Sequence, residues 1–323
     1  MKIGLWSDSV NFPSLPLMKI SAYHKRFGDT VTMVEKMGIY DKVYCSKTFN
    51  LPDIKKIPSE PPLYFADETE FGGTGYAIEI VNGREVYHPD KDKPLPSEIE
   101  NICPDYSLYP QYSEAYGFLT RGCCNNCSFC IVSQKEGRCS HQVADVTDFW
   151  TGQRKIVLLD ANILACKDRE KLLQQLIDSR ATIDFSQGLD ARLLDDGVIR
   201  AMNSMKVDLI HFAFDFMKNE DAILRGLQLF AKKYERSLRH KIVYILTNYN
   251  TTHEEDWYRV CKVRELGLTP DIRIYQKGTE DRFLTDLQRW CNSKVLYNST
   301  DFMNYIPRKD GKRCIDLYPE ILK

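Results

Sequence analysis

The sequence predicts an α/β protein built around a parallel sheet, and three observations support this prediction. Short apolar runs alternate with helical patterns along much of the chain, as they do in repeated strand–helix units. The 323 residues are enough for two ordinary domains, or for one large α/β barrel with an appendage. Hydrophobic residues make up 43% and charged residues 28%, which excludes a disordered chain or a fibre.

The first hundred residues predict a small Rossmann-like α/β unit. Residues 2–7 have the pattern of a strand, and Ser14 stands where its side chain would cap a helix with an early proline. Apolar residues then recur at helical spacing up to Gly28, which is expected to end the helix. Two further strands are predicted, at residues 30–34 and 42–46.

Residues 51–113 are expected to form exposed loop and linker. Pro58, Pro61, Pro62 and the segment 89–94 make this stretch rich in proline and charge. A glycine-rich turn, Gly72-Gly73-Thr74-Gly75, lies within it. Such loops lie on the surface and can face a substrate.

Six strands are predicted in the next part of the chain. They cover residues 115–120, 155–159, 182–186, 207–214, 241–247 and 271–276. Apolar residues recur at helical spacing between them, as at Leu172 and Leu176 or at Ile223 and Leu227. This alternation favours a parallel sheet with crossover helices.

The last helix of this series has clear boundaries in the sequence. Thr252 and Glu255 form a capping box, and Gly267 fits the end of the same helix. A C-terminal extension is expected to follow. In it, the stretch around Trp290 is interpreted as a docked helix and the basic residues 309–313 as a solvated turn.

Charge and hydropathy exclude several classes of protein. The 44 Lys and Arg residues balance 45 Asp and Glu residues, so no bulk charge favours a nucleic acid or a membrane surface. No apolar run approaches the eighteen or so residues of a membrane span, and the N-terminus does not have the pattern of a signal peptide. We therefore expect a cytoplasmic protein with reduced cysteines and no membrane partner.

The eleven cysteines are distributed unevenly. Seven are scattered, and the other four lie within residues 122–130, at Cys123, Cys124, Cys127 and Cys130. Such crowding favours a soft metal, either zinc or an iron–sulfur cluster. A ferredoxin run needs a fourth cysteine followed by proline, and a structural zinc site needs four ligands, usually in two pairs. Three ligands from one short loop suit a [4Fe–4S] cluster whose fourth iron is open.

This cysteine-rich segment resembles the signature loop of the radical S-adenosylmethionine superfamily. The signature is C-x3-C-x-aromatic-C, and a T-R-G-C opening is typical of members with a cobalamin-binding-like N-terminal domain. The resemblance implies that Cys123, Cys127 and Cys130 hold a [4Fe–4S] cluster and that Phe129 packs against the adenine of S-adenosylmethionine. Many relatives have proline in place of Cys124, which is interpreted as a non-ligand or as a replacement for Cys123.

The resemblance also implies an activity. In that superfamily the fourth iron binds the amino and carboxylate groups of S-adenosylmethionine. An electron from the reduced cluster cleaves the sulfonium bond and gives a 5′-deoxyadenosyl radical, which abstracts hydrogen from a substrate. The implied protein is an enzyme that works at low oxygen with a flavodoxin-like or ferredoxin-like electron donor.

The superfamily's partial (β/α)6 barrel matches the six predicted strands. The implied division is an N-terminal unit at residues 1–100, a linker at 101–114, the barrel at 115–278 and the extension at 279–323. Functional side chains of such barrels lie at the carboxyl ends of the strands. Cofactor or substrate contacts are therefore expected from Asp160, Asn162, Gln187, Asp215 and Asn248.

Structural alternatives exist for several of these residues. Asp160 and Asn162 stand where many relatives carry Gly-Gly-Glu. Gln187 opens a stretch similar to Q-G-x-D-x-R in cobalamin-domain relatives, in which helix capping by Asp190 and a salt bridge from Arg192 are the alternatives. For Asp215 and Asn248 the alternative is a loop turn.

Cobalamin binding is not expected. The family pattern D-x-H-x-x-G supplies the histidine that binds cobalt, whereas Asp8 is followed by Ser9-Val10-Asn11-Phe12-Pro13 and no histidine. The turn at residues 72–75 resembles the glycine loop that admits a cofactor in such domains. The first hundred residues are therefore predicted to form a degenerate cobalamin-binding-like domain.

The substrate stays open at this point. A nucleobase or tRNA, a peptide or protein side chain and a small metabolite are all compatible with the resemblance. Methylthiolation has no support, because only Cys45 and Cys103 precede the signature and a second cluster would need more ligands. Two other classes remain: a non-catalytic iron–sulfur electron carrier and a zinc-stabilised nucleic-acid-binding module.

Overall fold

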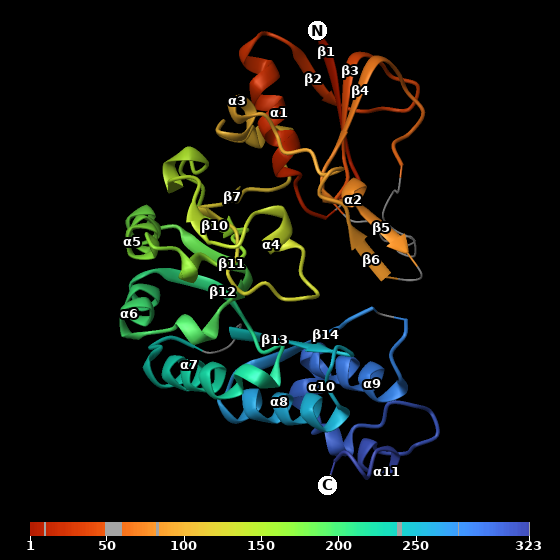
Figure 1. The fold of residues 1–323 in the computed structure, drawn as a ribbon, viewed down its shortest axis with the longest axis vertical. Coiled ribbons are helices and arrows are strands. Elements are labelled where there is room, and N and C mark those ends of the chain that lie inside the picture. The colour runs from red at the N-terminus through yellow and green to blue at the C-terminus, as the bar shows by residue number, and fades with distance from the viewer. Residues whose placement is uncertain (10, 49–59, 82–83, 238–240, 277, 323) are drawn as a thin grey trace. The chain divides into compact units, whose positions relative to one another are not determined.

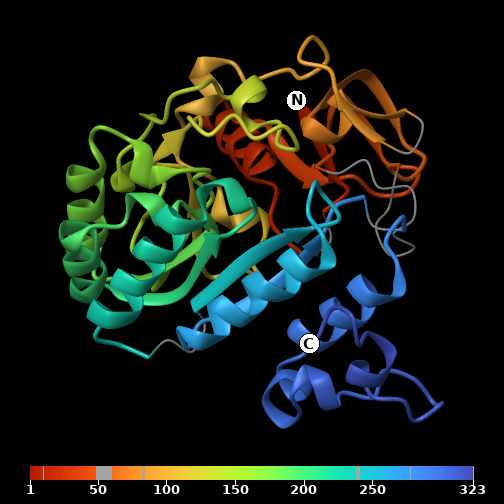
Figure 2. The same ribbon diagram turned by 60° about the horizontal axis from the view of Figure 1, so that its bottom comes forward.

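The computed structural model describes residues 1–9, 11–48, 60–81, 84–237, 241–276 and 278–322. It divides into two compact units, Met1–Val157 and Leu158–Lys323, called units 1 and 2 below. Figures 1 and 2 show the elements of both units. The finer domain division expected at residues 100, 114 and 278 stays a prediction.

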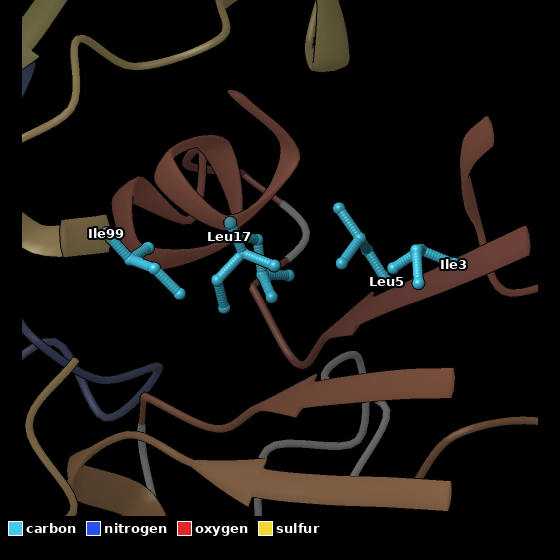
Figure 3. Close-up of a cluster of buried hydrophobic side chains, with 5 residues drawn as sticks. Ile3, Leu5, Leu17 and Ile99 are labelled. Carbon is cyan, nitrogen blue, oxygen red and sulfur yellow. The ribbon is translucent and has the colours of Figure 1, made fainter. Parts of the chain in front are cut away.

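Unit 1 begins with a four-stranded parallel sheet of order β2-β1-β3-β4 (Figure 1). Its strands are β1 Lys2–Ser7, β2 Thr30–Met33, β3 Ile39–Ser46 and β4 Phe65–Gly72. Helix α1, Leu15–Arg26, packs on one face of this sheet (Figure 3). The buried cluster between them consists of Ile3, Leu5, Leu17, Ile20 and Ile99.

The predicted start and end of α1 are only partly right. The early proline is confirmed, and Gly28 follows the helix at a φ of +80°, which favours glycine. Ser14 occupies the N-cap position, but its hydroxyl donates to the Oγ of Ser46 at 3.2 Å and makes no capping bond. The predicted side-chain cap is wrong because the end of β3 provides a competing acceptor.

The expectation of loop throughout residues 51–113 is also wrong for much of that range, of which 51–59 lie outside the described residues. It contains β4, α2 Thr74–Ala77, β5 Ile78–Val81, β6 Arg84–Tyr87 and α3 Ser97–Glu100. β4 has the sequence FADETEFG, whose charged residues led to the prediction of a loop. In the structure it is the last strand in the order of its sheet. Glu68 and Glu70 of this strand pair with Lys42 of β3 at 3.1 and 2.5 Å.

A six-stranded sheet of order β14-β13-β12-β11-β10-β7 confirms the predicted α/β class. Its strands are β7 Ala115–Gly117, β10 Lys155–Leu158, β11 Thr182–Leu189, β12 Lys206–Ala213, β13 Lys241–Thr247 and β14 Thr269–Ile274. The pairs from β11 to β14 are parallel. The strands lie side by side in chain order, as expected when each strand–helix unit follows the last in one direction.

Helices pack against one face of this sheet in unit 2 (Figure 1). They are α5 Arg169–Ser179, α6 Asp196–Ser204, α7 Glu220–Lys233 and α8 His253–Glu265. Phe212 of β12 meets Phe230 of α7 at 4.9 Å between ring centroids, and the side chains of Val243 and Ile245 are fully buried. The predicted capping box at Thr252 and Glu255 is confirmed, because each side chain accepts the other's backbone N–H.

The remaining elements are short, apart from one amphipathic helix. They are β8 Thr120–Arg121, β9 His141–Gln142, α4 Val132–Lys135, α9 Arg282–Cys291, α10 Lys294–Ser299 and α11 Cys314–Leu317. Single 3-10 turns lie at Tyr106–Leu108, Val146–Asp148, Ile163–Ala165, Ala191–Leu193, Met217–Asn219 and Phe302–Asn304. Trp290 on α9 is fully buried, which confirms a docked helix. Within the described ranges, no helix has the length and apolar character needed to span a membrane.

Candidate functional site

The cysteine loop, residues 122–137, leaves β8 and returns through α4 in unit 1. Its two ends are tied together, since the backbone N–H of Cys123 donates to the carbonyl of Gly137 at 3.1 Å. A second backbone bond, from Cys130 to Cys127 at 3.0 Å, makes a tight turn inside the loop. The closed base keeps all four cysteines on one short excursion of the chain.

Glu136 reinforces this closure with both carboxylate oxygens. Its Oε1 accepts from Arg121 at 2.8 Å and its Oε2 accepts from the backbone N–H of Gly122 at 3.1 Å. Arg121 also lies over the ring of Phe118, 3.5 Å from its centroid, and 3.5 Å from Glu100. The entry and exit of the cysteine loop are therefore held by one charge-assisted network.

Gly122 is required by the geometry of the loop base. Its φ is +87°, and a Cβ at this position would lie 2.2 Å from the carbonyl oxygen of Cys139. Gly137, across the base, has a φ of +96° and no atom within 4 Å of a built Cβ. The two glycines thus share a backbone conformation and differ in free space.

We expect Gly122→Ala to destabilise the protein more than Gly137→Ala by about 2 kcal/mol or more. Both variants carry the cost of alanine at positive φ, but only Gly122→Ala adds a collision with backbone. Urea unfolding followed by circular dichroism measures the difference. Equal losses of unfolding free energy in the two variants would show that the loop relieves the collision at residue 122 without an energetic cost.

The predicted ligands are partly accessible to solvent. Cys123, Cys127, Cys130 and Phe129 are partly buried, and Cys124 is exposed. Three thiols from one loop match, in number and softness, the donor set expected for an iron–sulfur cluster. Among the residues that the structure describes, however, no group of three or more His, Cys, Asp or Glu side chains is placed to hold a metal ion. The ligand assignment therefore stays a prediction.

The other predicted site residues belong to unit 2. Asp160 and Asn162 follow β10 and are buried, with 4% and 2% of their surface exposed. Asp215 follows β12, and its Oδ1 accepts the backbone N–H of Leu246 on β13 at 3.2 Å. Asn248 follows β13. Because the paired strands are parallel, their carboxyl ends meet at one edge, and Asp215 and Asn248 share it.

Gln187 does not lie where it was predicted. β11 continues to Leu189, so Gln187 is inside the strand and exposed. The register of β11 against β12 shifts between Phe185 and Gly188, which leaves Ser186 and Gln187 in an irregularity of the ladder. The prediction of a strand end at residue 186 is wrong because a bulge carries Gly188 back into the sheet.

Three residues of this edge have structural roles. Asp190 caps the turn at Ala191–Leu193 by accepting the N–H of Arg192, and the two side chains form an ion pair at 2.6 Å. These contacts are the capping and salt-bridge alternatives. Asn248 adopts a φ of +62°, and its Nδ2 donates to the carbonyl of Tyr275 at 2.9 Å and the hydroxyl of Thr279 at 3.0 Å. Its amide thus holds the loop after β14.

The pKa of Asp215 is raised to about 6, chiefly by burial. The carboxylate is therefore less favourable in the folded protein than in the unfolded chain, and this group contributes less stability as the pH rises from about 4 to 6. We expect Asp215→Asn, which keeps an acceptor for Leu246, to remove roughly 2–3 kcal/mol of that decline. Urea unfolding between pH 4 and 7 tests this, and an unchanged pH slope would contradict it.

Sequence reasoning missed a polar face of the unit 2 sheet, opposite the helices. In each strand, alternate residues point away from the apolar face. His211 of β12 stacks on Tyr244 of β13, with ring centroids 4.6 Å apart. Arg273 of β14 lies over the same tyrosine ring, 4.5 Å from its centroid. Asp271 pairs with Arg273 at 2.8 Å. The alternation of polar and apolar residues in β12 and β14 was the available signal.

Among the four polar-face residues His211, Tyr244, Asp271 and Arg273, His211 is the most buried. Its Nδ1 lies 3.0 Å from the carbonyl of Phe185, so Nδ1 is assigned the hydrogen and Nε2 the lone pair. Burial lowers its pKa, which favours the neutral ring. A neutral histidine with a fixed tautomer can accept a proton or a hydrogen bond through Nε2.

A buried ion pair holds the carboxyl edge from the helix side. Arg259 of α8 is fully buried and donates to the carbonyls of Phe214 at 2.7 Å and Leu246 at 2.9 Å. Its counter-ion is Asp256, at 2.5 Å. The ends of β12 and β13, and with them Asp215, are therefore fixed by one side chain.

Comparison with known proteins adds nothing to this geometry. A scan against protein-family models found no match for the chain, and a search of curated proteins found none either. The resemblance described above therefore depends on the cysteine loop and on its position after β7, the first strand of the six-stranded sheet.

Proposed function

We propose that the chain is a radical S-adenosylmethionine enzyme. The observation that carries this proposal is the set Cys123, Cys127 and Cys130, spaced C-x3-C-x-aromatic-C on one closed loop. The loop follows β7, the first of six strands that lie in chain order. This order supports a partial (β/α)6 barrel, which we propose as the finer description of the sheet.

In this proposal the three cysteines hold a [4Fe–4S] cluster. When bound, the cluster supplies one electron from a flavodoxin-like or ferredoxin-like donor for reductive cleavage of S-adenosylmethionine to methionine and a 5′-deoxyadenosyl radical that abstracts hydrogen from the substrate. Cys124 is exposed and serves as the non-ligand neighbour. We propose a cytoplasmic setting at low oxygen, in which the thiols stay reduced.

The protein's own contribution is to bind and orient. In this proposal Asp160, Asn162 and Asp215, at the carboxyl ends of strands, contact S-adenosylmethionine or substrate, whereas Asn248 holds the loop after β14. The fixed His211 and its neighbour Tyr244 give the polar face a hydrogen-bond acceptor and an aromatic ring. Such a face suits a substrate that is polar and partly planar, a description that a nucleobase and an aromatic side chain both meet.

The N-terminal sheet is proposed to work without cobalamin. The segment after Asp8 lacks the histidine that would bind cobalt. Asp8 itself is buried, and its Oδ1 accepts the backbone N–H of Thr48 at 2.9 Å. This carboxylate therefore stabilises the end of β3, next to the end of β1.

Anaerobic reduction of the iron-reconstituted protein with S-adenosylmethionine tests the proposal. The expected product is 5′-deoxyadenosine, detected by chromatography, from a brown protein whose spectrum changes on addition of S-adenosylmethionine. An intact cluster that gives no product with several reductants, and no spectral change, would instead support an electron carrier. Zinc in place of iron in the purified protein would support the nucleic-acid-binding module.

A further inference from the structure

The glycine-rich turn at residues 72–75 has a use that its sequence does not suggest. Gly73 has a φ of +96°, and a Cβ there would lie 2.5 Å from the carbonyl oxygen of Lys47. The backbone of Lys47 bonds to both sides of the turn, donating to Gly72 at 3.0 Å and accepting from Gly75 at 2.8 Å. The turn is therefore closed against the end of β3.

The side chain of Thr74 then points to the cysteine loop. Its hydroxyl accepts a hydrogen bond from the ammonium group of Lys135, the last residue of α4. Lys135 also pairs with the carboxylate of Asp92 at 3.0 Å. Asp92 is in turn bonded by the hydroxyl of Tyr87 at 2.7 Å, and its side chain is 9% exposed. The partner of Lys135 is thus itself fixed and shielded.

Lys135 and Glu136 are consecutive and hold the cysteine loop in two places. Glu136 ties the exit of the loop to its entry at Arg121 and Gly122. Lys135 ties α4 to Thr74 and Asp92, which lie at least 43 residues earlier in the chain. The lysine is 27% exposed, so solvent screens this ion pair less than one on the open surface.

We propose that Thr74 and Asp92 form a seat for Lys135, and that this seat positions the cysteine loop. In this chain the glycine-rich turn serves as a docking point for the loop that carries the metal ligands, in place of a cofactor-admitting loop. Lys135 is a positioning residue. The value of this positioning for a cluster rests on the proposed function, whereas the docking itself does not.

Alkylation of the metal-free full-length protein tests the docking. Brief exposure to iodoacetamide under reducing conditions, followed by peptide mass spectrometry, gives a rate for each cysteine. Lys135→Met is expected to raise the alkylation rates of Cys127 and Cys130 by about five-fold or more. The alkylation rate of the buried Cys45 and the melting temperature of the protein should stay unchanged. Thr74→Val is expected to act in the same direction and to add little in the double variant.

Two controls make the result specific. Lys135→Arg keeps the charge and the reach, and should restore rates near those of the unchanged protein. Lys91→Met removes an exposed lysine, 3.4 Å from Glu79, and should have no effect. Rates in Lys135→Met equal to those of the unchanged protein, or a general rise that includes Cys45, would overturn the proposal.

A second readout concerns the loaded protein. Lys135→Met should broaden or shift the electron paramagnetic resonance signal of the reduced cluster, and Lys135→Arg should not. Failure of iron to bind in any variant would contradict the proposed function and leave the alkylation result to decide the docking. An unchanged signal in Lys135→Met, together with unchanged alkylation rates, would contradict the seat.

Discussion

Cys127→Ser is expected to abolish formation of 5′-deoxyadenosine from S-adenosylmethionine. Serine keeps the size of the side chain but replaces a soft thiolate by a hydroxyl that binds iron weakly at neutral pH. Loss of an outer contact to a metal site already costs 10–100-fold, so loss of a direct ligand should lower turnover by roughly 100-fold or more. Product chromatography under anaerobic reduction, with iron and sulfide analysis, measures this loss.

Cys124→Ser is the matched control for Cys127→Ser. The two residues lie on the same loop, but Cys124 is exposed and assigned as a non-ligand. Its variant should keep iron, sulfide and turnover within about two-fold. If Cys124→Ser lost the cluster and Cys123→Ser kept it, the ligand set would be Cys124, Cys127 and Cys130.

Arg259→Met is expected to lower the free energy of unfolding by about 3–5 kcal/mol. The variant leaves Asp256 buried without its counter-ion and removes the donors to the carbonyls of Phe214 and Leu246. Breaking one half of a buried pair costs more than exchanging both halves, because an uncompensated charge remains. Urea unfolding monitored by tryptophan fluorescence measures the change.

An exposed pair on the same helix provides the control for Arg259. Lys262 and Glu265 lie 2.9 Å apart with side chains 33% and 60% exposed, so Lys262→Met should change stability by no more than about 0.5 kcal/mol. Adding Asp256→Leu to Arg259→Met should recover part of the loss. Similar losses for Arg259→Met and Lys262→Met would mean that the buried pair does not hold the strand ends.

Local signals were enough to predict much of the α/β framework. β13 was predicted at its observed bounds because Ile242, Val243, Ile245 and Leu246 form a nearly continuous apolar run. The capping box at Thr252 and Glu255 was predictable because both partners lie within one helical turn. In these cases the residues that decide the structure are neighbours in sequence.

Long-range contacts decided the cases that were mispredicted. β4 was concealed because its acidic side chains are balanced by Lys42, a residue of another strand. Gln187 was placed after β11 because a bulge depends on register with β12, which one strand alone does not encode. The side-chain cap of α1 was mispredicted because the hydroxyl of Ser14 donates to Ser46, 32 residues later in the chain.

The candidate site divides in the same way. The three predicted cluster ligands could be found from their spacing because they belong to one loop. His211 could not, because its fixed tautomer depends on the carbonyl of Phe185 and its stacking on Tyr244, each on another strand. The seat of Lys135 depends on Thr74 and Asp92, which no local pattern links to the cysteine loop.

The acidic pattern of β4 has a consequence for self-association. Within the described residues β4 is the last strand of its sheet, and it exposes Phe65 and Phe71 beside Asp67, Glu68 and Glu70. A second copy adding its own β4 along this edge would bring carboxylates opposite carboxylates, which repel at neutral pH. These charges therefore disfavour the addition of a second copy along this edge.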